Sequence, residues 1–262
     1  MVGNILKCFL LQSGFTVGMF FITGWLISLC NKVFYKNFGN YGKGICYFTG
    51  FIGTPVHELS HAFFCLIFGH KIQEIKLFRI ADDGILGYVE HSYNKKNIYH
   101  RVGNFFIGIA PLIVISLILF LLARWLIPSF AEAVYSVSKK IALFDGSSAL
   151  MYAKNAFAAF FVSAKDFKWW IFLSIGMFLS LHAALSGADI VGMLDGLIFV
   201  MLIGLLVDIV MGVLNLGVLI SFTRRIIKIG AVITGYMFLM LIFSIFEVCV
   251  SFAFSLKKSK SK

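Results

Sequence analysis

The chain has 262 residues, of which 60% are hydrophobic and 13% are charged, and its mean hydropathy is +0.93. Because about a quarter of the residues in soluble domains are charged, this composition excludes an ordinary soluble domain and indicates a membrane protein. The net charge of +11 does not predict a nucleic-acid partner, since the Lys and Arg residues fall between apolar runs and in the tail, where they suit the headgroup region of a lipid bilayer.

We interpret six apolar runs as membrane spans, and several of them have the roughly 20 residues that a helix needs to cross the hydrocarbon layer. The first run continues to Cys30 without a small-residue cleavage pattern, so we expect a retained span and not a removed signal peptide. The runs cover residues 9–30, 44–69, 105–127, 169–185, 190–222 and 226–256.

Two stretches between these runs have a different character. From Gly69 to Phe105, apolar residues and glycines alternate with charged residues, which predicts short strands joined by turns. The mixed segment 129–168 predicts either an interfacial helix or an additional span of low hydrophobicity. The Lys/Arg rule places both the Arg224, Arg225 and Lys228 cluster and the C-terminal lysines inside, so either the last run crosses twice or one cluster departs from the rule. We expect the C-terminal tail to be cytoplasmic.

The second run carries a motif that predicts chemistry. Residues 53–61 read Gly-Thr-Pro-Val-His-Glu-Leu-Ser-His, so His57 and His61 lie one helical turn apart and can both reach a single Zn2+. In metallopeptidases with a His-Glu-x-x-His motif, the glutamate, here Glu58, acts as general base toward a zinc-bound water. Such residues are costly inside an apolar helix unless they have partners or a function. The alternative is a buried polar network that holds helices together, which would not require this spacing.

These residues resemble the site-2-protease-like family of intramembrane zinc metallopeptidases. The resemblance rests on His57-Glu58-x-x-His61-Ala62 within a span, the strand-like stretch 71–91, the segment Gly-Ile-Ala-Pro-Leu at 108–112 and a later acidic span. It covers roughly residues 50–200 and implies hydrolysis of peptide bonds within or beside the membrane, in a wet cavity enclosed by the early helices, the hairpin and the later span. It also implies that the third zinc ligand is an Asp on that later span.

A tetrahedral catalytic zinc has three protein ligands and one open position. The stretch 182–196 offers His182, Asp189 and Asp195. Asp195 stands in a Leu-Asp-Gly triplet that the family usually shows, but the Asn and Pro that generally precede it are absent. Asp189 fits the looser pattern Leu-Ser-x-x-Asp-x-x-Gly of divergent members, although it could be only the N-cap of a helix that starts at Ile190. We predict Asp189 as the ligand, with Asp195 as its rival and His182 as a possible partner of a ligand.

The remaining candidate donors receive no metal role at this stage. His70, His91 and His100 stand near loop ends among charged residues, so we expect them to be solvated. The five cysteines form no Cys-x-x-Cys pair and lie mostly in or beside apolar runs, so neither a disulfide framework nor a thiolate zinc site is indicated. Asp208 and Glu247 lie in other spans without a visible motif.

The sequence therefore predicts one polytopic membrane domain over residues 1–262, all-α, with about six transmembrane helices and a short strand-like hairpin after the second span. The metallopeptidase-like core is expected at about 44–213 and a basic tail at 257–262. The predicted function is zinc-dependent intramembrane cleavage of membrane proteins or peptides, in an integral membrane protein expected in a bacterial cytoplasmic membrane. The alternatives are a membrane cation or metal transporter and a catalytically silent scaffold with the same fold.

Overall fold

The computed structural model describes residues 1–80 and 84–259. Two lysines of the predicted basic tail, Lys260 and Lys262, lie outside the described residues. For Lys257 and Lys258 the structure describes the backbone only.

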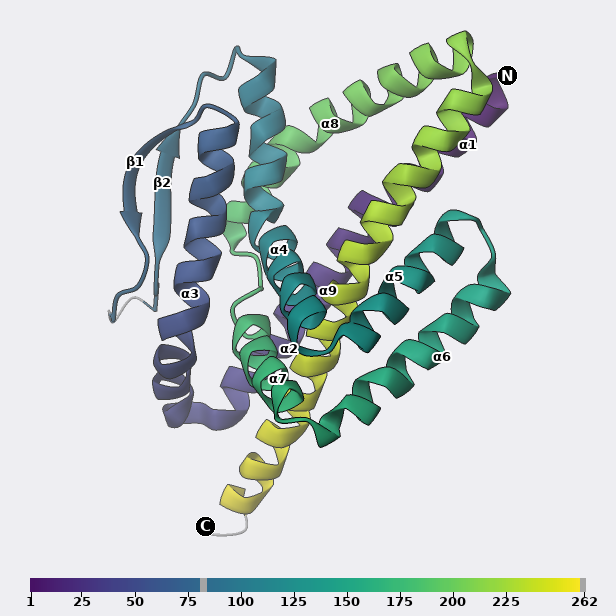
Figure 1. Cartoon of the computed structure of the whole chain (residues 1–262). Coiled ribbons are helices and arrows are strands. Elements are labelled where there is room, and N and C mark those ends of the chain that lie inside the picture. The colour runs from purple at the N-terminus through teal and green to yellow at the C-terminus, as the bar shows by residue number, and fades with distance from the viewer. Residues whose placement is uncertain (81–83, 260–262) are drawn as a thin grey trace. The chain divides into compact units, whose positions relative to one another are not determined.

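Helices account for 84% of the described residues, which confirms the predicted all-α class with a small sheet. Figure 1 shows the course of the chain. The elements in chain order are α1 (Val2–Ser13), a π-helical stretch (Gly14–Gly18), α2 (Met19–Phe38), a 3-10 turn (Gly39–Tyr41), α3 (Gly42–Ile67), β1 (Lys71–Lys76), β2 (Tyr88–Ser92), α4 (Ile98–Leu126), α5 (Pro128–Ala142), α6 (Gly146–Val162), a 3-10 turn (Ser163–Lys165), α7 (Phe167–Ser180), α8 (Gly187–Leu214) and α9 (Leu216–Ser259).

The predicted strand-like region forms an antiparallel hairpin of β1 and β2, which lies alongside α3 (Figure 1). In its ladder Lys71 pairs with Ser92 and Lys76 with Tyr88, and the register shifts between Ile72 and Glu74. An extra residue on one strand of this kind is a bulge, which bends the strand and increases its twist. The hairpin is therefore short and curved, and it leads the chain from the end of α3 to the start of α4.

Four helical segments of the described chain are long and apolar enough to cross a membrane: Val2–Phe38, Ile98–Leu126, Gly187–Leu214 and Leu216–Ser255. This is compatible with a membrane protein, but the expected count of about six spans is not confirmed. The predicted second span forms α3, whose apolar run is interrupted by buried polar residues such as Thr49, Thr54 and Glu58. The predicted fourth span forms α7, whose 14 residues extend only about 21 Å, against about 30 Å of hydrocarbon.

The last two predicted spans were divided at the wrong place. The break falls at Asn215, between α8 and α9, and not after Phe222. The Asn215 side chain accepts hydrogen bonds from the amides of Gly217 and Val218, at 2.8 and 3.3 Å, and so caps the N-terminus of α9. Hydropathy alone does not detect such a cap, because the apolar run continues on both sides of it.

The mixed segment 129–168 forms two helices, α5 and α6, that pack against each other as a hairpin. Asp145 begins α6, since its side chain accepts a hydrogen bond from the amide of Ser148 at 3.1 Å. Hydrogen bonding from the Ser148 side chain, and then from its amide, holds the pKa of the Asp145 carboxyl below its usual range. Among the described residues, neither α5 nor α6 belongs to the four candidate spans.

The described residues form two compact units. The first gathers Met1–Ile22, Ser116–Leu173 and Ile198–Met237. Its interior holds an aromatic cluster of Phe130, Phe160, Phe172 and Tyr236. It also buries Asp208, whose two carboxylate oxygens accept hydrogen bonds from the amide nitrogen of Gln12 at 3.0 and 3.1 Å.

The second unit gathers Thr23–Ile115, Ser174–Leu197 and the described residues from Phe238 onward. It contains α3, the hairpin, the first part of α4 and the stretch Ser174–Leu197, and therefore all of the predicted metal-site residues. In this unit Asn31 donates to the carbonyl oxygens of Ser180 and Leu181, both at 3.0 Å, and the Ser180 hydroxyl contacts the buried carboxyl of Glu247. These bonds fix the backbone immediately before His182.

Candidate metal centre

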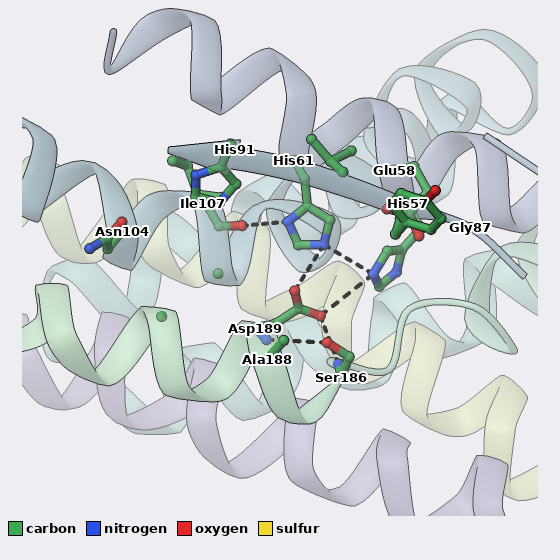
Figure 2. Close-up of a pocket in the computed structure, with 14 residues that line it drawn as sticks. His57, Glu58, His61, Gly87, His91, Asn104, Ile107, Ser186, Ala188 and Asp189 are labelled. Carbon is green, nitrogen blue, oxygen red and sulfur yellow. Dashed lines mark hydrogen bonds and ion pairs between the residues drawn. The ribbon is translucent and has the colours of Figure 1, made fainter. Parts of the chain in front are cut away.

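The two histidines of the motif project from α3 into one cavity (Figure 2). Each is oriented by a backbone carbonyl: Nδ1 of His57 lies 2.8 Å from the carbonyl oxygen of His182, and Nδ1 of His61 lies 2.8 Å from that of Ile107. Because a carbonyl oxygen only accepts, both Nδ1 atoms must carry a proton. In the neutral imidazoles the lone pairs therefore lie on the two Nε2 atoms, which is the tautomer that binds a metal through Nε2.

The two Nε2 atoms converge on the carboxylate of Asp189 (Figure 2). They lie 3.1 Å from each other, and the Asp189 oxygens lie 3.2 Å from Nε2 of His61 and 3.7 Å from Nε2 of His57. One donor atom from each of the three residues lies within 4.8 Å of the others. When both imidazoles are neutral, the two Nε2 lone pairs and the Asp189 carboxylate face one another with no proton to share. A cation bound between them would accept electron pairs from all three donors.

Asp189 is held at this position by the start of α8. The helix begins at Gly187, not at Ile190 as expected. The backbone amide of Ser186 donates to the Asp189 carboxylate at 2.7 Å, and the Asp189 amide donates to the Ser186 hydroxyl at 3.1 Å. This reciprocal pair is a capping box, which stabilises the first turn of a helix. The cap thus fixes the rotamer that turns the remaining carboxylate lone pairs toward His57 and His61.

The rival carboxylate, Asp195, lies in a different set of contacts. It is paired with Arg101 and accepts hydrogen bonds from Asn104 at 2.7 Å and from Tyr93 at 3.3 Å. A Cβ at the adjacent Gly196 would come within 2.3 Å of the Phe105 amide nitrogen, so α8 approaches the α4 backbone closely there. The structure brings Asp189, and not Asp195, together with the two histidines. The Leu-Asp-Gly triplet instead packs α8 against α4, through the contacts of Asp195 and Gly196.

Glu58 lines the same cavity, which measures about 210 Å3, and its side chain is 7% exposed. The hairpin closes over it: a Cβ at Gly87 would lie 2.8 Å from Cγ of Glu58, from the carbonyl oxygen of Lys76 and from a methyl group of Thr54. Only a glycine therefore fits at position 87 without moving a neighbour. The sequence offered no signal for this residue, because the contact joins two elements about thirty positions apart.

His182 contacts α3 through both its backbone and its ring. Its Nε2 lies 2.9 Å from the hydroxyl of Thr49, and a Cβ at Gly53 would come within 2.5 Å of the ring. Burial, and then the nearby His57, lower the pKa of His182 to about 4, so the ring is neutral at neutral pH. Both ring nitrogens face hydroxyl groups of α3, Nε2 that of Thr49 and Nδ1 that of Thr54 at 3.4 Å, so the ring does not belong to the converging donor set.

The prediction that His70 and His91 are solvated is wrong. His70 is 4% exposed and His91 is half-buried. Nδ1 of His70 lies 3.1 Å from Nδ1 of His91, and Nε2 of His70 lies 2.9 Å from the carbonyl oxygen of His100. Burial lowers the pKa of His70 and of His91. The chain reverses after α3 and folds the hairpin back over these side chains, which composition alone does not reveal.

Residues 50–145 match a family model, DUF3267, whose description is "Putative zincin peptidase". The chain carries a zinc-metallopeptidase-like segment. This segment includes His57, Glu58 and His61, the hairpin and α4 with the Ile107 carbonyl, and the family's description implies zinc binding. It ends before Asp189. No curated protein and no solved structure gave a match.

Proposed function

We propose that this protein is a zinc-dependent endopeptidase of the site-2-protease-like type, which cleaves membrane-associated substrates with His57, His61 and Asp189 as metal ligands and Glu58 as general base. One observation carries the proposal: two imidazoles with protonated Nδ1 atoms present their Nε2 atoms, together with a carboxylate, to a single point.

The donor set fits zinc. Two imidazole nitrogens and one carboxylate are the protein ligands of a catalytic zinc site that leaves one position open. Zinc held there would polarise a water and the peptide carbonyl next to it. The hydrogen bonds that orient the ligands are also typical of a zinc site. Each His ligand donates its other N–H to a backbone carbonyl, and the Asp189 carboxylate is fixed by a helix cap.

The position of Glu58 supports its proposed role in proton transfer. It follows His57 directly in α3 and lines the same cavity, so one of its carboxylate oxygens can accept a proton from a water that lies between it and the three donors. It can then deliver that proton to the leaving amine nitrogen. A Cβ at Gly87 would lie 2.8 Å from Cγ of Glu58, so the hairpin backbone packs directly against this side chain.

The edge of the hairpin can bind an extended substrate peptide beside the site. Tyr88 and Val89 of β2 line the cavity together with Gly87. Among the described residues β2 is paired with β1 alone, so a substrate strand can add to its other edge through main-chain hydrogen bonds. A substrate helix keeps its carbonyls bonded internally, and an added strand would hold the unwound segment with its peptide bond toward Glu58.

A location within the membrane is supported by the helices that carry the site. Ile107 lies in α4 and Asp189 in the first turn of α8, and both helices are long and apolar enough to cross a bilayer. The peptide bonds that reach this cavity are therefore those of segments in or beside the bilayer. Soluble folded proteins are not expected as substrates.

The test uses the full chain in proteoliposomes with a single-span peptide whose helix contains a Gly/Pro interruption. We expect cleavage that stops after chelation and returns with Zn2+, without zinc flux across the vesicle membrane. Cleavage that is unaffected by zinc removal would refute the metallopeptidase. Zinc flux without cleavage would instead support the transporter, and zinc binding with neither activity would support the silent scaffold.

A further inference from the structure

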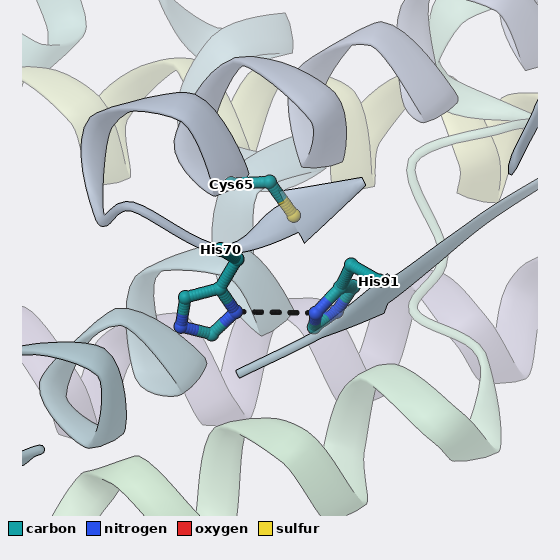
Figure 3. Close-up of side chains that lie close together, drawn as sticks. All are labelled: Cys65, His70 and His91. Carbon is teal, nitrogen blue, oxygen red and sulfur yellow. Dashed lines mark hydrogen bonds between the residues drawn. The ribbon is translucent and has the colours of Figure 1, made fainter. Parts of the chain in front are cut away.

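A second group of candidate metal-binding side chains lies where α3 ends, separate from the three ligands of the candidate centre. Cys65 comes from the last turn of α3, His70 from the turn that follows it, and His91 from β2 (Figure 3). One donor atom from each residue lies within 4.8 Å of the others. Neither the proposed peptidase mechanism nor the family match assigns a role to this cluster.

The chain is folded sharply to bring these residues together. Gly69 has a φ of +69°, a conformation that glycine adopts without strain. The turn allows the His70 amide to donate to the Cys65 carbonyl at 2.9 Å, so His70 folds back over the end of the helix. The ladder then pairs Ile72 with His91, which brings β2 level with this turn.

The His70 ring is held in one orientation. Its Nε2 donates to the carbonyl oxygen of His100 at 2.9 Å, and the ring stacks on Tyr93 with an interplanar angle of 12°. A Cβ at Gly103 would lie 3.1 Å from this Nε2, so α4 also confines the ring. With its proton on Nε2, neutral His70 presents the lone pair of Nδ1 to the cluster, 3.1 Å from Nδ1 of His91.

The spacing suits a metal ion. In a tetrahedral zinc site, bond lengths of about 2.0–2.3 Å place neighbouring donor atoms about 3.5 Å apart, between the 3.1 Å nitrogen pair and the 4.8 Å upper limit of the cluster. The Cys65 side chain is fully buried and supplies sulfur, a ligand that favours zinc over magnesium or calcium. We propose that Cys65, His70 and His91 form a second metal site, which binds Zn2+ independently of the peptidase centre.

The site joins the hairpin to the helix that carries the peptidase motif. Cys65 lies one helical turn after His61 on α3, and His91 also lines the peptidase cavity. A bound ion fixes β2, and with it the strand edge beside the cavity, to the end of α3. Occupation of this site therefore stabilises the hairpin.

The experiment measures metal content and thiolate coordination in the purified full chain. The wild type is expected to bind two equivalents of Zn2+ per chain, and Cys65→Ser and His91→Ala are each expected to bind one. Cys46→Ser is the matched control, because it removes a cysteine from the same helix, outside the cluster. With Co2+ as probe, we expect a thiolate charge-transfer band in the wild type and in Cys46→Ser, but not in Cys65→Ser.

A second measurement separates this site from the peptidase centre. Asp189→Asn is expected to lose one zinc and keep the thiolate band, whereas Cys65→Ser loses the band and keeps the other zinc. Amide exchange in β1 and β2 should become faster in Cys65→Ser and remain unchanged in Cys46→Ser. If the wild type shows no thiolate band and Cys65→Ser and His91→Ala keep the wild-type metal content, His70 and His91 share only a hydrogen bond and the second site is refuted.

Discussion

The glycine that packs against the general base allows a graded test of the proposed site. In Gly87→Ala the new Cβ would lie 2.8 Å from Cγ of Glu58 and from the Lys76 carbonyl, where ordinary contacts begin at 3.4 Å. The contact with Glu58 requires its side chain to move by about 0.6 Å or more, and the contact with the Lys76 carbonyl requires a shift of the hairpin backbone. A misplacement of about 1 Å can cost 10²-fold in rate, so we expect kcat to fall by roughly 10–100-fold, which is about 1.4–2.7 kcal/mol of transition-state stabilisation.

The measurement is steady-state cleavage of the interrupted single-span peptide in proteoliposomes, with zinc content determined on the same preparation. Gly192→Ala is the control, because Gly192 lines the same cavity and a Cβ there meets nothing within 4 Å. We expect Gly192→Ala to keep the wild-type kcat and both variants to keep their zinc. If Gly87→Ala cleaves at the wild-type rate, the assigned position of Glu58 is wrong.

Two further predictions concern the ligands and their support. Asp189→Asn should lower zinc affinity at the peptidase centre by more than about 100-fold, which exceeds the loss typical for a residue that only supports a ligand. Asp195→Asn should lower thermal stability and keep zinc. Zinc affinity is measured by competition with a chelating dye, and an equal loss in the two variants would contradict the assignment of Asp189. Gly53→Ala should displace the His182 ring, whose atoms lie 2.5–2.7 Å from the new Cβ. Zinc binding should weaken, because the His182 carbonyl that orients His57 moves with the ring. An unchanged zinc affinity in the same dye competition would show that the position of this carbonyl does not depend on the ring.

The motif residues could be predicted from the sequence because their spacing is a property of one helix. His57 and His61 are four positions apart, and a helix alone places them on one face. The third donor depends on how α8 packs against α3 and α4. Asp189 and Asp195 lie on the same helix, and their contacts distinguish them, because Asp189 faces the two histidines while Asp195 pairs with Arg101.

The cluster at the end of α3 could not be predicted for a similar reason. Cys65, His70 and His91 belong to a helix, a turn and a strand, and no short sequence pattern connects them. The polarity of their neighbours suggested solvation, but the positive φ of Gly69 and the strand pairing bury them. The break at Asn215 was missed because a capping hydrogen bond does not change the hydropathy of a long apolar run.

Replacement of the general base tests the proposed activity most directly. Glu58→Gln keeps the size of a side chain that is 7% exposed and removes its capacity to accept a proton. We expect zinc content equal to that of the wild type and a fall in kcat of about 10²–10⁴-fold, the usual contribution of a general base. Full zinc-dependent cleavage of the interrupted peptide by Glu58→Gln would contradict the account.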